Sequence, residues 1–115
     1  ISNQPDFSRK LIDSSFIQEN IKKILSELSI SIALICPHLS SDNCQCRKPN
    51  IGLIEFYRKQ NPNCCKEEIF IGDQISDEKC AKSLKIPFIK IHDSYSVYNN
   101  ISKILNNYKN IKLEY

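Results

Sequence analysis

The sequence predicts an α/β fold in which helices flank a parallel sheet. Short apolar runs, which are typical of buried strands, alternate along the chain with segments whose apolar residues follow helical spacing. Strands that are separated by helices pair in parallel, and their crossover connections are right-handed. The chain has 115 residues, of which 41% are hydrophobic, and it shows no internal repeat or linker. We therefore expect residues 1–115 to form one domain or part of one.

The predicted elements follow one another along the whole chain. Pro5 ends the first strand, and a capping-box pair, Ser15 and Gln18, marks the start of the first helix. The turn residues Asn-Pro-Asn end the second helix. In chain order we expect a strand end at 1–4, a helix at 15–28, a strand at 30–35, a helix at 51–60, a strand at 69–71, a helix at 77–84, a strand at 87–91 and a helix at 97–108.

A loop that directly follows the strand predicted at 30–35 contains four potential metal ligands: Cys36, His38, Cys44 and Cys46. Their Cys-x-His and Cys-x-Cys spacing lets each arm of the loop supply two ligands to a tetrahedral zinc ion. Because the protein fills all four positions and leaves none for water, the predicted Zn²⁺ is structural. Disulfides are the alternative, but Cys44 and Cys46 are too close to pair comfortably, and His38 would then have no role.

Two cations, Arg47 and Lys48, stand side by side where this loop ends. A guanidinium can bind a phosphate through two parallel hydrogen bonds, whereas an ammonium acts as a compact charge. If the metal holds the loop rigid, both cations are fixed in position. The loop exit therefore predicts a site for a phosphate group.

Further polar residues follow two other predicted strands. Ser2 and Asn3 lie at the end of the first, and Asp73 comes directly after the strand at 69–71. Ligands of parallel sheets lie beyond the carboxyl ends of the strands, so these groups and the loop are expected at one end of the sheet, where they suit a phosphate and Mg²⁺. In isolation, Ser2 and Asn3 are better explained by a turn, and Asp73 is equally consistent with a helix cap. Asp77 is the better candidate for a cap or for support of Asp73.

Composition and charge exclude several classes of protein. The formal net charge is +3 and is spread along the chain, so it does not indicate a nucleic-acid or membrane partner. No run approaches the roughly 20 apolar residues of a membrane span, and no signal peptide is visible. Three of the six cysteines lie outside the loop, and the pattern assigns no role to Cys64, Cys65 and Cys80. Free thiols and a metal loop favour a reducing cytoplasm.

The order of these motifs resembles the haloacid-dehalogenase-like phosphatases, which have a Rossmann-like parallel sheet flanked by helices. The matching stretches are Ser2-Asn3-Gln4, the Cys36–Pro49 loop with its Arg-Lys-Pro ending, and Gly72-Asp73 followed by Asp77. The loop is similar to that of the zinc-loop group, which contains D-glycero-D-manno-heptose 1,7-bisphosphate phosphatase and histidinol-phosphate phosphatase. The likeness extends over about residues 1–91.

The resemblance implies a Mg²⁺-dependent hydrolysis of a phosphomonoester through an aspartyl-phosphate, with a structural Zn²⁺ in the loop. Lys48 and Ser2 would act on the phosphoryl group as catalytic residues. Asp73 would be a magnesium ligand, supported by Asp77, and Cys36, His38, Cys44 and Cys46 would bind zinc. The implied substrate-binding residues are Ser2, Asn3, Gln4, Arg9, Arg47 and Lys48.

Details of the sequence point to two different substrates. Residues 3–9 (Asn-Gln-Pro-Asp-Phe-Ser-Arg) and 49–53 resemble the heptose enzyme, whereas residues 34–39 and the five-residue gap before Cys44 resemble histidinol-phosphate phosphatase. The resemblance favours heptose 1,7-bisphosphate, a precursor in lipopolysaccharide-core and ADP-heptose synthesis. Histidinol phosphate, from histidine biosynthesis, is the alternative. We expect a cytoplasmic protein that binds a small phosphorylated substrate. A complete protein would be a monomer, whereas a truncated one could bind a partner chain.

The chain departs from the family pattern in one important respect. It contains no Asp-x-Asp motif, which supplies the family's nucleophile and its general acid. Because the chain begins at Ile1 and contains no Met, we expect a preceding strand with that motif to be missing from it. Two other positions also depart from the family pattern. Lys10 stands where the family commonly has Gly, and Gln74 stands where it commonly has Arg or Ser.

These departures leave a second hypothesis open. The chain could be a non-catalytic, zinc-bound domain that binds a sugar phosphate, or a partner chain at an exposed sheet edge. A zinc-finger binder of nucleic acid fits poorly, because the basic residues are scattered and the ligand spacing differs from that of a finger.

Overall fold

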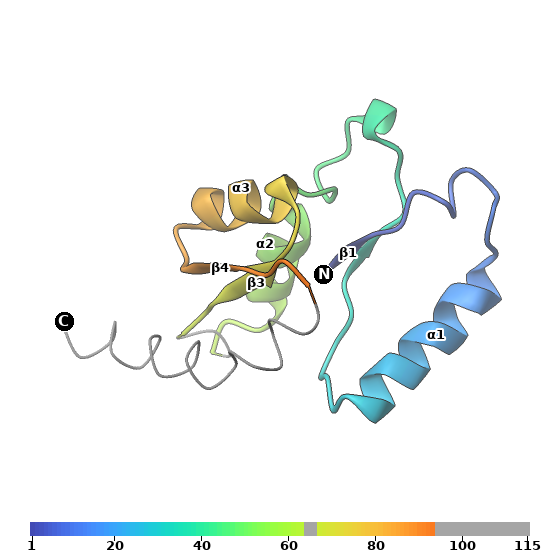
Figure 1. The fold of residues 1–115 in the computed structure, drawn as a ribbon, viewed down its shortest axis with the longest axis horizontal. Helices are drawn as coiled ribbons and strands as arrows, with labels where there is room; N and C mark the ends of the chain where they lie inside the picture. The colour runs from blue at the N-terminus through green and yellow to red at the C-terminus, as the bar shows by residue number, and fades with distance from the viewer. Residues whose placement is uncertain (64–66, 94–115) are drawn as a thin grey trace, which may run out of the picture. The chain divides into compact units, whose positions relative to one another are not determined.

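The computed structural model describes residues 1–63 and 67–93. They belong to two compact units, Ile1–Lys66 and Glu67–Tyr115. The helix predicted at 97–108 lies outside the described residues, as do Cys64 and Cys65. The described elements, in chain order (Figure 1), are β1 (Ser2–Asn3), α1 (Ser14–Glu27), β2 (Ile35–Cys36), the 3₁₀ helix η1 (Ser40–Asp42), α2 (Gly52–Gln60), β3 (Phe70–Gly72), α3 (Ile75–Leu84) and β4 (Phe88–Lys90).

The first unit is built on a short parallel pair of strands, β1 and β2, in which Asn3 lies opposite Cys36. The strand predicted at 30–35 is wrong in its extent, because only Ile35 of that run belongs to β2, which continues to Cys36. Ile30 and Ile32 are 43% and 47% exposed. An apolar run becomes a strand only where it has a partner for its main-chain groups, and β1 supplies one only to the end of this run.

Helix α1 forms where its apolar spacing predicts it, but its cap differs from the expected one. Asp13 is the N-cap, and its carboxylate accepts a hydrogen bond from the main-chain nitrogen of Phe16 at 2.8 Å. The Ser15 hydroxyl donates to the same carboxylate oxygen at 2.7 Å, so the predicted capping box of Ser15 and Gln18 is wrong. An ionised carboxylate is the stronger acceptor at a helix N-terminus.

Helix α1 lies beside the segment that leads into β2 (Figure 1), and side chains of both line a mostly apolar groove of about 380 Å³. No residue of α1 is buried. Among residues 1–63, only Cys36 and Ile54 are buried apolar residues. The apolar core of this unit is therefore small.

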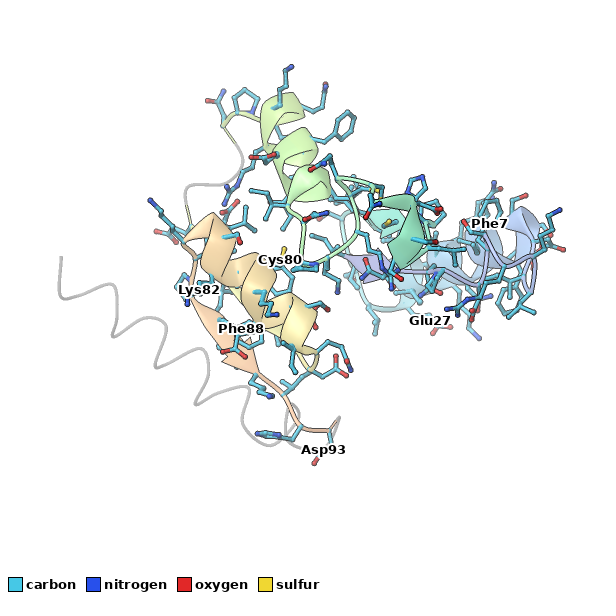
Figure 2. All side chains as sticks on the ribbon, turned by 90° about the horizontal axis from the view of Figure 1, so that it is seen from above. Phe7, Glu27, Cys80, Lys82, Phe88 and Asp93 are labelled. Atoms are coloured by element: carbon cyan, nitrogen blue, oxygen red, sulfur yellow. The ribbon has the colours of Figure 1, made fainter. Side chains whose placement is uncertain are left out.

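The second unit packs α3 against a second parallel pair, β3 and β4, with Phe70 opposite Phe88. The two rings stand 6.3 Å apart. Cys80 on α3 and Phe88 on β4 are labelled in Figure 2. The helix buries Cys80, Ala81 and Leu84, which form the apolar core of the described part of this unit.

Parallel pairing is thus confirmed, although the described strands form two separate pairs instead of one continuous sheet. Within residues 1–63 and 67–93, no helix has the length and hydropathy needed to cross a membrane.

Candidate functional site

The four predicted metal ligands converge in the first unit. The Nδ1 atom of His38 and the sulfurs of Cys36, Cys44 and Cys46 all lie within 4.8 Å of one another. The Cys46 sulfur is 3.2 Å from that of Cys36 and 3.1 Å from His38 Nδ1, and the Cys36 and Cys44 sulfurs are 3.6 Å apart. A tetrahedron with zinc–sulfur bonds of about 2.3 Å has sulfur–sulfur edges of about 3.8 Å. The cluster thus has nearly the size and the donor types of a zinc site, and it could hold one metal ion.

Local structure explains why residues that are spread over eleven positions meet. Cys36 ends β2 and is fully buried. The chain then turns through η1, where the main-chain nitrogen of Leu39 donates to the Asp42 carboxylate at 2.8 Å. Asn43 follows in the left-handed region with φ of 48°, which directs the chain back toward Cys36. Cys44 and Cys46 consequently return to the end of β2.

The thiols of the cluster have unequal proton affinities. Burial alone would raise the pKa of Cys44, but hydrogen bonds from Cys46, Cys36 and the Arg47 main chain together lower that pKa to about 7. Burial raises the pKa of Cys46 to about 12, and the hydrogen bonds and charges of Cys36 and Cys44 act in the same direction. Cysteine binds a metal ion as a thiolate, so binding of a cation to this cluster releases the protons of the remaining thiols.

The basic pair at the loop exit is fixed to the metal loop and to β1. Arg47 donates from its guanidinium to the His38 carbonyl oxygen at 3.1 Å. The main chain of Lys48 exchanges two hydrogen bonds with the side chain of Asn3, and the Lys48 ammonium lies 3.4 Å from the Ile1 carbonyl oxygen. The Lys48–Pro49 peptide bond is cis. Both cations are half-buried, so they combine restraint with access to a ligand.

Of the predicted substrate-binding residues, Ser2, Asn3 and Gln4 lie together on and after β1. The Ser2 hydroxyl accepts a hydrogen bond from the Gln4 side-chain amide at 2.8 Å. Arg9 lies farther along the following loop, where it is exposed and forms a 2.9 Å ion pair with Asp6. An exposed ion pair of this kind is weak, so Arg9 is free to exchange Asp6 for an anionic ligand.

The predicted magnesium ligand and its supporting residue belong to the second unit. Asp73 follows β3, is exposed, and accepts a hydrogen bond from the Gln74 side chain at 2.8 Å. Asp77 is 3% exposed, and its carboxylate accepts the Gln74 main-chain N–H at 3.0 Å. Asp77 therefore caps α3, which is one of the two roles that the sequence analysis expected for it. That Asp73 shares a site with Ser2 and Lys48 stays a prediction.

Sequence reasoning used the chain's two glycines only as parts of motifs and did not predict how closely they pack. A Cβ on Gly52 would lie 2.5 Å from the Gln45 carbonyl oxygen, which accepts the Gly52 N–H at 3.0 Å. A Cβ on Gly72 would collide with the Asp77 carboxylate. The signal was available, because a chain of 115 residues with only two glycines has one where the backbone of Gln45 approaches closely and the other where the Asp77 side chain does.

Comparison with known proteins places the chain in a family. The family described as polynucleotide kinase 3 phosphatase matches residues 1–107. The chain belongs to this family. The resemblance to the zinc-loop group of haloacid-dehalogenase-like phosphatases is thereby confirmed.

Several curated relatives share the name histidine biosynthesis bifunctional protein HisB. The protein of Legionella pneumophila (strain Lens) is 38% identical over 72 residues, which are 63% of this chain and 20% of the relative. The protein of Blochmanniella floridana is 39% identical over 72 residues, which again are 63% of this chain and 20% of the relative. The matched part of the chain thus spans about a fifth of the length of these relatives.

A solved structure confirms the α/β fold. The crystal structure of D,D-heptose 1.7-bisphosphate phosphatase from B. bronchiseptica, complexed with magnesium and phosphate, superposes with a TM-score of 0.62. It has 23% sequence identity, and the match covers 75% of this chain and 51% of that one. At this identity the likeness shows the fold alone.

Proposed function

We propose that the protein of which this chain forms part is a phosphatase that hydrolyses a phosphomonoester of a small metabolite. The observation that carries this proposal is the attachment of Lys48 and Arg47 to a metal cluster on one side and to β1 on the other. Two cations held in this way would neutralise the oxygens of a phosphoryl group without having to be ordered on binding. The phosphatase family of the chain supports the same activity.

The residues of this chain would act mainly by binding and by neutralising charge. The Ser2 hydroxyl would hold a phosphoryl oxygen, and the Lys48 ammonium would offset the negative charge on the others. Arg47 and Arg9 would bind the remainder of the substrate. The nucleophilic carboxylate that the family uses is expected in an Asp-x-Asp motif, which these 115 residues do not contain.

Two metal ions fit this proposal. The Cys36, His38, Cys44 and Cys46 cluster has the donors and spacing for a structural Zn²⁺. Asp73 offers an exposed carboxylate for Mg²⁺, and the structural neighbour is described as complexed with magnesium and phosphate. When bound, Mg²⁺ would reduce the repulsion between an attacking carboxylate and a phosphate. We further propose a cytoplasmic location, which suits free thiols.

Two substrates are supported by different observations. Heptose 1,7-bisphosphate, and with it a role in heptose and lipopolysaccharide synthesis, is supported by the resemblance of residues 3–9 and by the name of the structural neighbour. Histidinol phosphate is supported by the curated relatives, whose names place them in histidine biosynthesis. Each observation concerns a different relative, so a direct comparison of the two substrates is needed.

The decisive assay measures phosphate release from both esters by the complete natural protein in the presence of Mg²⁺. We expect turnover of one ester at a kcat/KM at least tenfold above the other. Lys48→Ala should abolish most of that turnover, whereas Lys59→Ala, which removes an exposed lysine from the last turn of α2, should not. Absence of phosphate release from either ester by the complete wild-type protein would refute the proposed function.

A second candidate is a zinc-bound domain that binds a phosphate ester through Lys48 and Arg47 without hydrolysing it. Calorimetric titration separates the candidates. Binding of inorganic phosphate that requires Lys48, with no turnover of either ester, would support the binding domain.

A further inference from the structure

The side chain of Asn3 joins β1 to the exit of the metal loop. Its Oδ1 atom accepts the main-chain N–H of Lys48 at 3.1 Å, and its Nδ2 atom donates to the main-chain carbonyl oxygen of Lys48 at 3.2 Å. One side-chain amide thus pairs with both polar main-chain groups of a residue 45 positions away. Such a two-point contact fixes orientation as well as distance.

Asn3 contacts both ends of the metal loop. The main chain of Asn3 lies opposite Cys36, the first ligand of the metal cluster, in the β1–β2 pair. Lys48 follows Cys46, the last ligand, by two residues. Both ends of the metal loop therefore meet at Asn3, one through the sheet and the other through its side chain.

The Lys48 ammonium also lies near β1. That ammonium is 3.4 Å from the Ile1 carbonyl oxygen, so it stands beside the residue that precedes Ser2. Ser2 is the first residue of β1, so the Ser2 hydroxyl and the Lys48 ammonium both lie near the start of this short strand. A phosphate that contacts both depends on the register between β1 and the loop exit.

We propose that Asn3 is a positioning residue that fixes the main chain of Lys48, so that the Lys48 ammonium and the Ser2 hydroxyl address one phosphate. This inference rests on the proposed phosphatase function. It differs from the expectation that Asn3 binds substrate, because one donor and one acceptor of its amide already pair with the main chain of Lys48. Displacement of a catalytic group by about 1 Å can cost on the order of a hundredfold in rate.

Asn3→Asp tests the proposal with little change of volume. The carboxylate keeps an acceptor for the Lys48 N–H but replaces the Nδ2 donor by an oxygen that faces the Lys48 carbonyl oxygen. In the complete zinc-loaded protein we expect kcat to fall roughly tenfold to a hundredfold, with KM changed much less and zinc content unchanged. The matched control is Asn20→Asp, since the Asn20 amide donates to the Phe16 carbonyl oxygen within α1, and it should leave kcat unchanged.

A double-mutant cycle with Lys48→Ala distinguishes positioning from direct substrate contact. If Asn3 acts through Lys48, the double variant should be no slower than Lys48→Ala alone. If the two losses multiply, Asn3 contributes independently of Lys48, and the proposal is overturned.

Amide hydrogen exchange tests the contact without any activity. In the zinc-loaded wild-type protein the Lys48 N–H should be protected, and in Asn3→Ala it should exchange about five to ten times faster, as expected from the loss of one hydrogen bond. Equal exchange in both proteins overturns the proposal. A protein that lacks turnover but shows the protection difference would refute the proposed function and leave the positioning contact established.

Discussion

Removal of the loop metal should strongly destabilise the first unit. Cys36 and Ile54 are the only buried apolar residues among residues 1–63, and α1 has no buried residue. A core of this size supplies little stability, so small domains commonly rely on metals or other cross-links. Because the four ligand atoms lie within 4.8 Å of one another, one ion can connect the end of β2 to the loop exit.

The magnitude follows from mass action. Free Zn²⁺ at about 100 times its Kd stabilises the folded state by roughly 2.7 kcal/mol, provided that the unfolded chain binds it weakly. For a domain of about 60–100 residues, each 1 kcal/mol shifts Tm by roughly 4–8 °C. We therefore expect a chelator to lower the Tm of the zinc-loaded protein by about 10–20 °C.

Thermal unfolding followed by circular dichroism, with zinc content measured by mass spectrometry, provides the assay. Cys46→Ser removes the ligand that lies close to both Cys36 and His38, so this variant should bind little zinc and respond little to the chelator. Cys80→Ser is the control, because Cys80 is a buried free cysteine that belongs to α3 in the second unit, and this variant should retain the zinc. An unchanged Tm after chelation, or full zinc content in Cys46→Ser, would refute the reasoning.

Three single substitutions test local contacts. Gly52→Ala should cost about 1–3 kcal/mol and weaken zinc binding, because its Cβ would lie 2.5 Å from the Gln45 carbonyl oxygen; an unchanged Tm and zinc affinity would contradict this. Hydrogen bonds from the Phe16 main chain and the Ser15 hydroxyl lower the pKa of Asp13 below 3.8, so its cap stabilises α1 above that pH and is lost as pH falls through the lowered pKa. Asp13→Asn should keep the helix but lose this acid dependence of helicity, and an identical acid transition in both proteins would count against the cap. Asp77→Ala should lower the unfolding free energy by about 1–3 kcal/mol, since it removes the buried acceptor of the Gln74 N–H, and denaturant unfolding with no shift of midpoint would exclude that role.

The metal cluster is predictable from sequence because its information is local. The four ligands lie within eleven residues, so they meet when this loop folds back on itself, and that fold does not depend on the remainder of the chain. The helices are predictable for a similar reason, since 3.6-residue spacing is a property of each segment. The cap of α1 was mistaken because Asp13 and Ser15 both satisfy the local pattern, and the choice between them depends on hydrogen bonds that the pattern does not contain.

Long-range pairings account for what the sequence does not predict. The apolar run at 30–35 looks like a complete strand, but its extent is set by β1, which pairs with it over a very short length. The hydrogen bonds between Asn3 and Lys48 join residues 45 positions apart, and no periodicity or spacing in the sequence predicts them. The same holds for Gly52, whose role depends on the approach of the Gln45 carbonyl.

The fixed ends of the metal loop have a consequence for its length. Between His38 and Cys44 the chain passes through η1, whose residues are exposed and held by local hydrogen bonds of the loop tip. Both ends of the loop are anchored at Asn3, so extra residues at this tip would extend into solvent without moving the ligands. The tip is therefore a place where related chains can differ in length, and where a tag or a reporter peptide can be inserted.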